Sequence, residues 1–301
     1  LTVSQTVSSI VVTPGSSGVN LNGSVTLSAA ASDQFGATMT VQPTFTWSKS
    51  GVGSVTGGVF SAGTTAGSAT ITASAGGVNG SASVTVGNAS PTVTTPATGN
   101  GTGSTSTTLS VLGADDGGES GLTYSWSLTS GPGTVSFSAN GSNGAKATAV
   151  TFSKAGNYTF QVTLSDGTLT TTSSVTLTVV ETITRIAVTP GTSGVNLNGT
   201  KTLSAVASNQ FGAAMTVQPT FSWGNTGVGS VSGGLFTAGT TAGSATITAS
   251  AGGVNGNATV TVGNASPTVT TPATGNGTGG TSTTLSVLGA DDGGESGLTY
   301  S

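Results

Sequence analysis

The stretch GLTYSWSLTS, residues 121–130, decides the fold class of this chain. Its apolar residues alternate with threonine and serine, and they are Leu122, Tyr124, Trp126 and Leu128. A period of two places all four side chains on one face of an extended strand and the hydroxyl residues on the other. The stretch therefore predicts a half-buried β-strand with an indole ring on its buried face.

The same alternation recurs along the chain. The other groups are Val25, Leu27, Ala29 and Ala31; Ala69, Ile71 and Ala73; Leu109 and Val111; Tyr158, Phe160, Val162 and Leu164; and Val175, Leu177 and Val179. Turn dipeptides separate these groups, at Asn22-Gly23, Asn79-Gly80, Asn140-Gly141 and Asp166-Gly167. Asn-Gly and Asp-Gly between alternating segments indicate hairpins, and we see no segment with helical periodicity. We therefore predict an all-β fold of antiparallel β-sandwiches.

Aromatic residues indicate where the cores lie. A ring two positions before a tryptophan occurs three times, as Phe45 with Trp47, Tyr124 with Trp126, and Phe221 with Trp223. A tryptophan on a central strand is typical of immunoglobulin-like sandwiches, so we predict that these rings anchor the cores rather than stack on a ligand. Tyr158, at the start of its alternating group, is placed to form a tyrosine corner.

A tandem repeat organises the chain. Residues 1–125 align without gaps on residues 177–301 at an offset of 176 and differ at 22 positions. Such self-similarity is typical of an array of modules. Because the sequence starts without methionine and stops in the middle of the pattern, we expect it to be part of a longer protein.

Each period divides into two dissimilar modules, at GNASPTV (residues 87–93) and VVETITRI (residues 179–186). The predicted domains are the end of a preceding module at 1–6, two related domains at 7–87 and 182–263, a different domain at 88–181, and a truncated copy of it at 264–301. Pro91 and Pro267 lie at the joints, where a fixed φ angle favours a stiff connection. We therefore expect the sandwiches to be arranged as an extended rod.

Composition excludes several classes of function. The 301 residues include no cysteine and no histidine, and only 14 are charged (5 basic and 9 acidic). Imidazole catalysis, thiol chemistry, disulfides and ordinary zinc sites are therefore excluded. The five cations are scattered and the net charge is −4, which argues against nucleic-acid binding. No membrane span or signal peptide is visible in this segment.

The modules resemble known families. IVVTP, GSVTLSAAASDQFG, PTFTWSKS and GGVFSAGTTAGSATITASAGG, within residues 7–87, are similar to bacterial Ig-like group 2 domains, and residues 186–262 repeat the pattern. TTLSVLGADDGGESGLTYSWSLTSGPGTVSFS and TFSKAGNYTFQVTLSDG resemble the polycystic-kidney-disease (PKD)-type and cadherin-like Ig-fold modules that alternate with such domains in large bacterial surface proteins. The WDFGDG-type core of the PKD repeat is absent. The resemblance implies extracellular tandem sandwiches without enzymatic activity.

Acidic residues are concentrated in one repeated loop, GADDGGESG. Six of the nine carboxylates lie in its two copies: Asp115, Asp116, Glu119, Asp291, Asp292 and Glu295. A glycine-flanked loop can offer carboxylate and carbonyl oxygens together, as calcium requires, and Asp166 is a further candidate ligand. The alternative is a solvated acidic turn. Calcium is the one cofactor that the sequence suggests.

Other chemistry has weaker support. Adjacent aspartates in a hairpin point to opposite sides, which disfavours a glycosidase carboxylate pair. Lys146 and Lys154 are candidates for an isopeptide crosslink with an asparagine beside an acidic residue. The alternative is that both are exposed lysines that aid solubility. The Asn-x-Ser/Thr sequons are numerous, but this composition generates them by chance.

We therefore predict a non-enzymatic structural protein, extracellular or at a cell surface, whose tandem modules form a stalk, surface fibre or adhesin spacer. Because so few charges oppose association, a laterally self-assembling filament or sheath is one alternative. A glycan- or protein-binding adhesive module is the other. The expected partners are other copies of the chain or neighbouring modules, with a surface glycan or protein as a further possibility.

Overall fold

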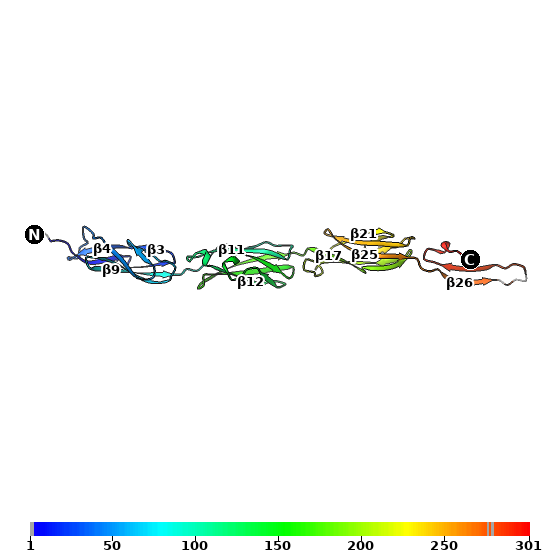
Figure 1. Ribbon diagram of the computed structural model, residues 1–301, viewed down its shortest axis with the longest axis horizontal. Helices are drawn as coiled ribbons and strands as arrows, with labels where there is room; N and C mark the ends of the chain where they lie inside the picture. The colour runs from blue at the N-terminus through cyan, green and yellow to red at the C-terminus, as the bar shows by residue number, and fades with distance from the viewer. Residues whose placement is uncertain (1–2, 276, 278–279) are drawn as a thin grey trace. The chain divides into compact units, whose positions relative to one another are not determined.

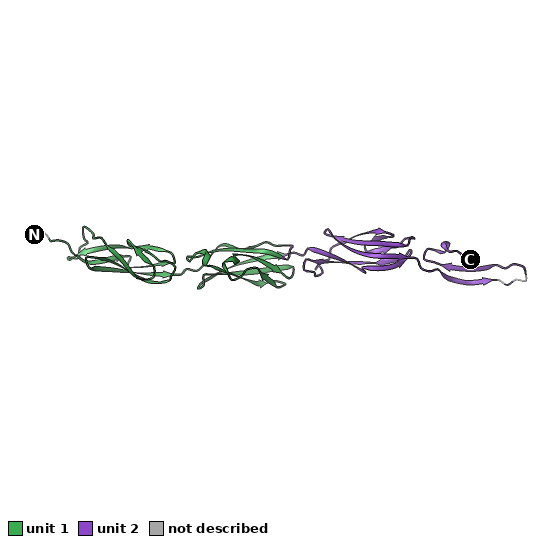
Figure 2. Ribbon diagram, viewed as in Figure 1, with its two compact units in different colours: residues 1–102, 106–178 green, residues 103–105, 179–301 purple. Residues whose placement is uncertain are grey.

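The computed structural model describes residues 3–275, 277 and 280–301. Strands make up nearly all of its regular structure, and the helices are single 3₁₀ turns, η1 (Glu119–Gly121), η2 (Asn143–Lys146) and η3 (Glu295–Gly297). The chain divides into two compact units (Figure 2). Unit 1 contains residues 1–102 and 106–178, and unit 2 contains residues 103–105 and 179–301.

Unit 1 begins with a sandwich, here the first sandwich, built from residues 7–87 (Figure 1). Its strands are β1 (Val7–Thr13), β2 (Ser16–Asn20), β3 (Ser24–Thr26), β4 (Ser28–Asp33), β5 (Thr46–Gly51), β6 (Ser54–Thr56), β7 (Val59–Ser61), β8 (Gly67–Ala75) and β9 (Val78–Gly87). They form sheets of order β1-β4, β2-β9-β8-β5 and β3-β7-β6. The inward positions of β8 and β9 are small or branched apolar residues, and their outward positions are mostly serine and threonine, so one face of the sheet is buried.

The first sandwich contains one parallel pair of strands. β1 runs antiparallel to β4, but after Pro14 and Gly15 the chain continues as β2, which pairs in parallel with β9. Proline has no backbone N–H to donate, so the ladder with β4 ends there and the chain crosses to the other sheet. Alternation and turn signals do not reveal such a crossing.

The second sandwich of unit 1 follows, built from residues 92–179. Its strands are β10 (Thr92–Gly99), β11 (Ser106–Ala114), β12 (Thr123–Ser130), β13 (Val135–Phe137), β14 (Ala147–Phe152), β15 (Gly156–Ser165) and β16 (Thr170–Val179). They form a four-stranded sheet, β10-β11-β14-β13, and a three-stranded sheet, β12-β15-β16. Phe152, Tyr158 and Phe160 form an aromatic cluster in this core, with ring centroids 4.8–6.3 Å apart.

Unit 2 repeats the first sandwich at the same offset of 176 residues; this is the third sandwich. Its strands are β17 (Ile183–Thr189), β18 (Thr192–Asn196), β19 (Thr200–Thr202), β20 (Ser204–Asn209), β21 (Ser222–Gly227), β22 (Ser230–Ser232), β23 (Leu235–Thr237), β24 (Gly243–Ala251) and β25 (Val254–Gly263). The sheet orders match, including a parallel pair of β18 with β25. Strands β26 (Thr268–Gly275) and β27 (Leu285–Ala290) then form a hairpin. The predicted fold class, tandem immunoglobulin-like sandwiches, is confirmed.

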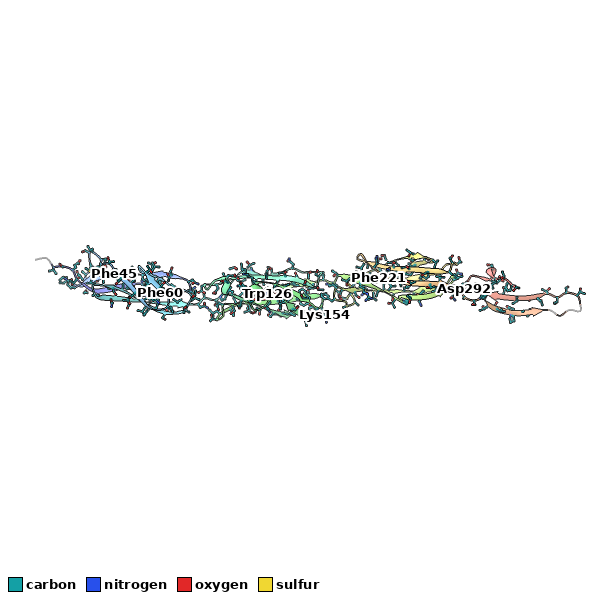
Figure 3. All side chains as sticks on the ribbon, in the orientation of Figure 1. Phe45, Phe60, Trp126, Lys154, Phe221 and Asp292 are labelled. Atoms are coloured by element: carbon teal, nitrogen blue, oxygen red, sulfur yellow. The ribbon has the colours of Figure 1, made fainter. Side chains whose placement is uncertain are left out.

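The rings at the centres of the cores only partly match the prediction. Trp126 is buried, and its Nε1 donates to the carbonyl of Ala145 at 2.8 Å. Trp47 and Trp223 are only half-buried at the side of their cores. The fully buried rings there are Phe60 and Phe236, both 0% exposed. Figure 3 labels Phe60 and the half-buried Phe45 of the first sandwich.

One glycine fixes the position of Trp47. Gly58 has φ +83°, and a Cβ atom there would lie 2.6 Å from the carbonyl oxygen of Leu27 and 3.1 Å from the indole. Only glycine fits this turn without displacing the backbone. The indole therefore packs against the turn before β7.

The tyrosine corner is confirmed. Tyr158 is fully buried, and its hydroxyl donates to the carbonyl oxygen of Lys154 at 2.8 Å. Burial raises the pKa of this phenol, because the phenolate would lose its hydration. Among the described residues, we find no helix of the length and hydropathy that crossing a bilayer requires.

Candidate functional site

The acidic loop lies between β11 and β12 in the second sandwich, and its copy follows β27 in unit 2. Asp115 Oδ2 accepts a hydrogen bond from the backbone nitrogen of Gly117 at 2.9 Å, and Gly118 closes the turn at φ +94°. Asp291 makes the same bond to Gly293 at 3.1 Å. The first aspartate of each loop therefore shapes its own turn.

The second aspartate connects two sandwiches. Asp116 Oδ2 accepts hydrogen bonds from the backbone nitrogens of Leu21, at 3.0 Å, and Ala89, at 3.1 Å. Leu21 follows β2 of the first sandwich, and Ala89 lies in the segment between the sandwiches. One carboxylate thus holds the end of the first sandwich, the connecting segment and the second sandwich together. We call Asp116 and its partners the joint clamp.

Asn22 completes the joint clamp from the other side. Its Nδ2 donates to the backbone carbonyl of Asp116 at 2.7 Å. Its φ angle of 55° is in the left-handed region, which asparagine tolerates better than most residues. This conformation and the preceding turn direct the amide towards the loop.

The clamp is repeated within unit 2. Asp292 Oδ2 accepts from Leu197 and Ala265, both at 3.0 Å, and Asn198 Nδ2 donates to the Asp292 carbonyl at 2.8 Å. Asn198 has φ 60°. Figure 3 labels Asp292 beside the third sandwich. The same contacts therefore occur at both positions where the repeat places this loop.

A second carboxylate ties the connecting segment in unit 1. Asn88 Nδ2 donates to Asp166 Oδ2 at 2.7 Å. The other oxygen, Oδ1, accepts from the backbone nitrogens of Leu169 and Thr168, both at 2.7 Å. These hydrogen bonds, with that from Leu169 the strongest, lower the pKa of Asp166 to about 2.

Glu119 faces another direction. It pairs with Lys146 at 3.1 Å, and Oε1 accepts from the hydroxyl of Tyr124 at 2.9 Å and from Asn143 at 3.1 Å. The hydrogen bonds from Lys146 and Tyr124 hold the pKa of Glu119 below its ordinary value. In the second copy, Glu295 accepts from Tyr300 at 2.9 Å. The third acidic residue of the loop thus supports the sandwich to which it belongs.

Lys146 lies 3.2 Å from Asn143 Oδ1 and next to an acid, which are the groups that an isopeptide crosslink would need. The side chains of Lys146 and Glu119 are 39% and 31% exposed. Attack on an amide needs a neutral amine, which burial in a dry core favours. This hydrated position instead suits an ion pair, which contributes about 0–1 kcal/mol.

The six predicted ligands therefore divide into three pairs with different partners. In the part of the chain that the structure describes, no group of three or more His, Cys, Asp or Glu residues could hold a metal ion. One oxygen of each aspartate, Oδ1 of Asp115, Asp116, Asp291 and Asp292, is shielded from solvent and has no hydrogen-bond partner among the described residues. The calcium site stays a prediction.

Sequence reasoning did not identify the partners of Asp116. Leu21 and Ala89 contribute only backbone nitrogens, which carry no side-chain signal. The turn at Asn22-Gly23 predicts a hairpin, and neither this dipeptide nor its copy at Asn198-Gly199 indicates a contact with the acidic loop.

Comparison with protein families identifies one module. Residues 89–179 match the family model described as K319L-like, PKD domain. The second sandwich is thus an Ig-fold PKD-like module. No curated protein sequence matches the chain.

Comparison with solved structures gives weak overall likenesses. The chain is similar to Drosophila N-cadherin EC1-4, with 14% identity, a TM-score of 0.43, and 83% of this chain and 73% of that one covered. It is also similar to domains 1-6 of the surface layer protein SbsC, with 17% identity, a TM-score of 0.30 and 94% of this chain covered. The chain spans 48% of that SbsC fragment. A titin I-band fragment matches at 10% identity and a TM-score of 0.37, over 85% of this chain and 99% of the fragment.

Proposed function

We propose that the chain is a non-enzymatic, extracellular structural protein in which clamped tandem sandwiches act as a spacer in a stalk, surface fibre or adhesin. One observation carries this proposal: the same carboxylate contacts, from Asp116 and from Asp292, join successive modules in both copies. A hydrogen bond to a charged group contributes about 1.5–3 kcal/mol. The Leu21 nitrogen divides its donation between Asp116 and the carbonyl oxygen of Gly87, both at 3.0 Å, so it contributes less than the bond from Ala89. Together the two bonds favour one arrangement at the joint. Its partners would be other copies of itself or neighbouring modules of the same long chain.

The domain assignment belongs to this proposal. We assign residues 7–87 and 182–263 to bacterial Ig-like group 2 domains, which alternate with PKD-type or cadherin-like modules at 88–181 and, truncated, at 264–301, after the end of a preceding module at 1–6. In this arrangement each joint clamp lies between modules of different type, so an array has one clamp of this kind per period of 176 residues.

Electron microscopy of lengthened chains tests the spacer function. A ten-residue strand such as β9 spans about 33 Å, so each added sandwich should extend the particle by about 30–40 Å. We expect particle length to increase in proportion to module number when a further period of 176 residues is added. Particles whose modules cluster into a compact body, with no gain in length, would contradict a spacer function.

A laterally assembled filament or sheath is a second candidate. The outward side chains of β8 and β9 are serine, threonine and asparagine, so this sheet face carries hydroxyls and no charge. Uncharged faces lack the repulsion that keeps small domains apart. Sedimentation across a hundredfold range of protein concentration distinguishes the two functions: the spacer stays a single chain, whereas the filament grows.

Calcium binding at the acidic loop is a further proposal, favoured by the shielded and unpartnered Oδ1 atoms of Asp115 and Asp116. Hard cations are held by carboxylate and carbonyl oxygens, and extracellular sites bind calcium with dissociation constants of about 0.1–1 mM. Calcium at about 10 mM should then raise the melting temperature of the chain, because selective binding to the native state stabilises it. The Asp115→Asn/Asp291→Asn variant should lose this response. An unchanged melting temperature of the parent chain at that concentration would remove the site.

A further inference from the structure

Two residue positions differ between the first and third sandwiches, and in each sandwich the side chains at these two positions contact each other. In the first sandwich, Gln5 Nε2 donates to Asp33 Oδ2 at 2.8 Å. At the equivalent place in the third sandwich, Asn209 Nδ2 donates to Glu181 Oε1 at 2.8 Å. The carboxylate and the amide have exchanged places, so each pair keeps one donor and one acceptor.

The buried member of each pair has a second role that does not change. Oδ1 of Asp33 accepts from the backbone nitrogens two and four residues later, both at 3.0 Å, and Oδ1 of Asn209 does the same at 3.0 and 3.2 Å. Both side chains are 4% exposed. The turn therefore needs an oxygen that aspartate and asparagine both supply. The copies differ in the second polar atom of this side chain, which is Oδ2 in Asp33 and Nδ2 in Asn209. This atom faces the segment before β1 or β17.

A separate exchange lies on the same strands. Val11 of β1 is the cross-strand partner of Ala30 in β4. In the third sandwich Ala187 of β17 is the partner of Val206 in β20. Each pair again consists of one valine and one alanine. The valine lies on β1 in the first sandwich and on β20 in the third.

We propose that these two exchanges direct β1 and β17 each to its own sandwich and oppose swapping of these strands between the copies. Sequences that differ at only 22 of 125 aligned positions are prone to such swapping, a common failure of tandem repeats. Entry of β17 into the first sandwich would place the Glu181 carboxylate on the buried Asp33 carboxylate. Like charges held this close disfavour the wrong partner strongly.

The two possible strand exchanges, β17 into the first sandwich and β1 into the third, are not equally unfavourable. Entry of β1 into the third sandwich places Gln5 on Asn209, where two amides can still form a hydrogen bond. The electrostatic penalty therefore falls on β17 entering the first sandwich. Ala187 would there face Ala30 in place of Val11, which is 60% exposed, so this second exchange contributes little. Specificity in this arrangement comes from conflict in the wrong pair, since each native pair forms its own amide–carboxylate hydrogen bond.

Disulfide trapping on the full chain tests this proposal, because the natural sequence has no cysteine. Thr13 and Ser28 are exposed cross-strand partners of β1 and β4, and Thr189 is the equivalent of Thr13 in β17. Cross-strand Cα atoms are about 4.5–5.5 Å apart, within disulfide range. The Thr13→Cys/Ser28→Cys variant reports the native pairing, and the Ser28→Cys/Thr189→Cys variant reports β17 in the first sandwich. Both are unfolded, refolded in a glutathione buffer, and scored by mass spectrometry of the crosslinked peptides.

The reporters are compared in the parent background and in Gln5→Glu/Asp33→Asn, which gives the first sandwich the same pair as the third. We expect the crosslink between positions 28 and 189 to be at least about tenfold rarer than the native crosslink in the parent, and to rise about tenfold in the exchanged background. Equal amounts of that crosslink in both backgrounds would overturn the proposal. The reciprocal Glu181→Gln/Asn209→Asp background should give the same rise. If neither exchanged pair supports a folded sandwich, the two pairs are not interchangeable, and the proposal is also overturned.

Discussion

Asp116 Oδ2 lies 3.0 Å from the backbone nitrogen of Leu21, a residue 95 positions earlier, and Asp292 Oδ2 lies 3.0 Å from Leu197 at the same separation. Each aspartate belongs to one module and each leucine to the end of the module before it. A side chain that interacts across a joint in this way restricts how the two modules rotate against each other. This restriction is the basis of the spacer function that we propose.

The clamp makes a local prediction about Ala89. The amide of Ala89, in the connecting segment, donates to Asp116, so Asp116→Ala should speed the hydrogen exchange of this amide by about 10- to 100-fold, equivalent to loss of a charged hydrogen bond. Asp115→Ala is the matched control, because Asp115 bonds within its own loop to Gly117. It should leave the Ala89 rate within about threefold of the parent. Equal effects of the two variants, measured by NMR, would mean that the loop acts as a whole and not through Asp116.

Burial predicts which ring stabilises the first sandwich most. Phe60 is 0% exposed, so Phe60→Ala should cost about 3–5 kcal/mol, whereas Trp47→Ala should cost less because the indole is only half-buried. The free energy of opening is measured from the slowest-exchanging amides of β8. Phe236→Ala, the same change in the third sandwich, serves as the control and should leave β8 unaffected. A larger loss for Trp47→Ala would restore the tryptophan as the anchor of this core.

The lowered pKa of Asp166 predicts that the stability of the joint in unit 1 falls at acidic pH. Its folded pKa is about 2, below the ordinary value of 3.8, so the folded state favours the ionised carboxylate. The stability that this gives is fully present above about pH 4 and is lost as the pH falls towards 2. Asp166→Asn should therefore flatten the dependence of the melting temperature on pH in that window. Parallel curves for parent and variant would mean that the hydrogen bonds from Leu169 and Asn88 do not depend on the charge.

Much of the fold could be predicted because alternation is a local property. The alternating segments that contain Trp126 and Phe160 form strands in the structure, at Thr123–Ser130 and Gly156–Ser165. Phe60 could not be identified as a core centre, since it lies in β7, a strand of three residues that is too short to show a period. The parallel pairing of β2 with β9 depends on a contact between distant parts of the module, which alternation does not encode.

The site was predicted only as far as its residue types. A loop rich in carboxylates is visible in the sequence, but the roles of adjacent aspartates depend on which groups face them in the fold. Asp115 meets its own turn, whereas Asp116 meets one backbone nitrogen from the module before it and one from the connecting segment. Likewise, the sequence shows that Asp33 is replaced by Asn209 in the second copy, but not which residue faces each of them. The structure shows that Gln5 and Glu181 compensate for it.

Spin labels on either side of the joint in unit 1 measure whether Asp116 restricts the motion of the two sandwiches. Ser48 and Ser127 are exposed strand residues of the first and second sandwiches, and the chain has no natural cysteine to interfere with labels at these positions. Pulsed electron paramagnetic resonance should give one narrow distance distribution in the parent background and a clearly broader one with Asp116→Ala. A parent distribution as broad as that of the variant would show that the modules move freely at the joint and that Asp116 does not restrain them.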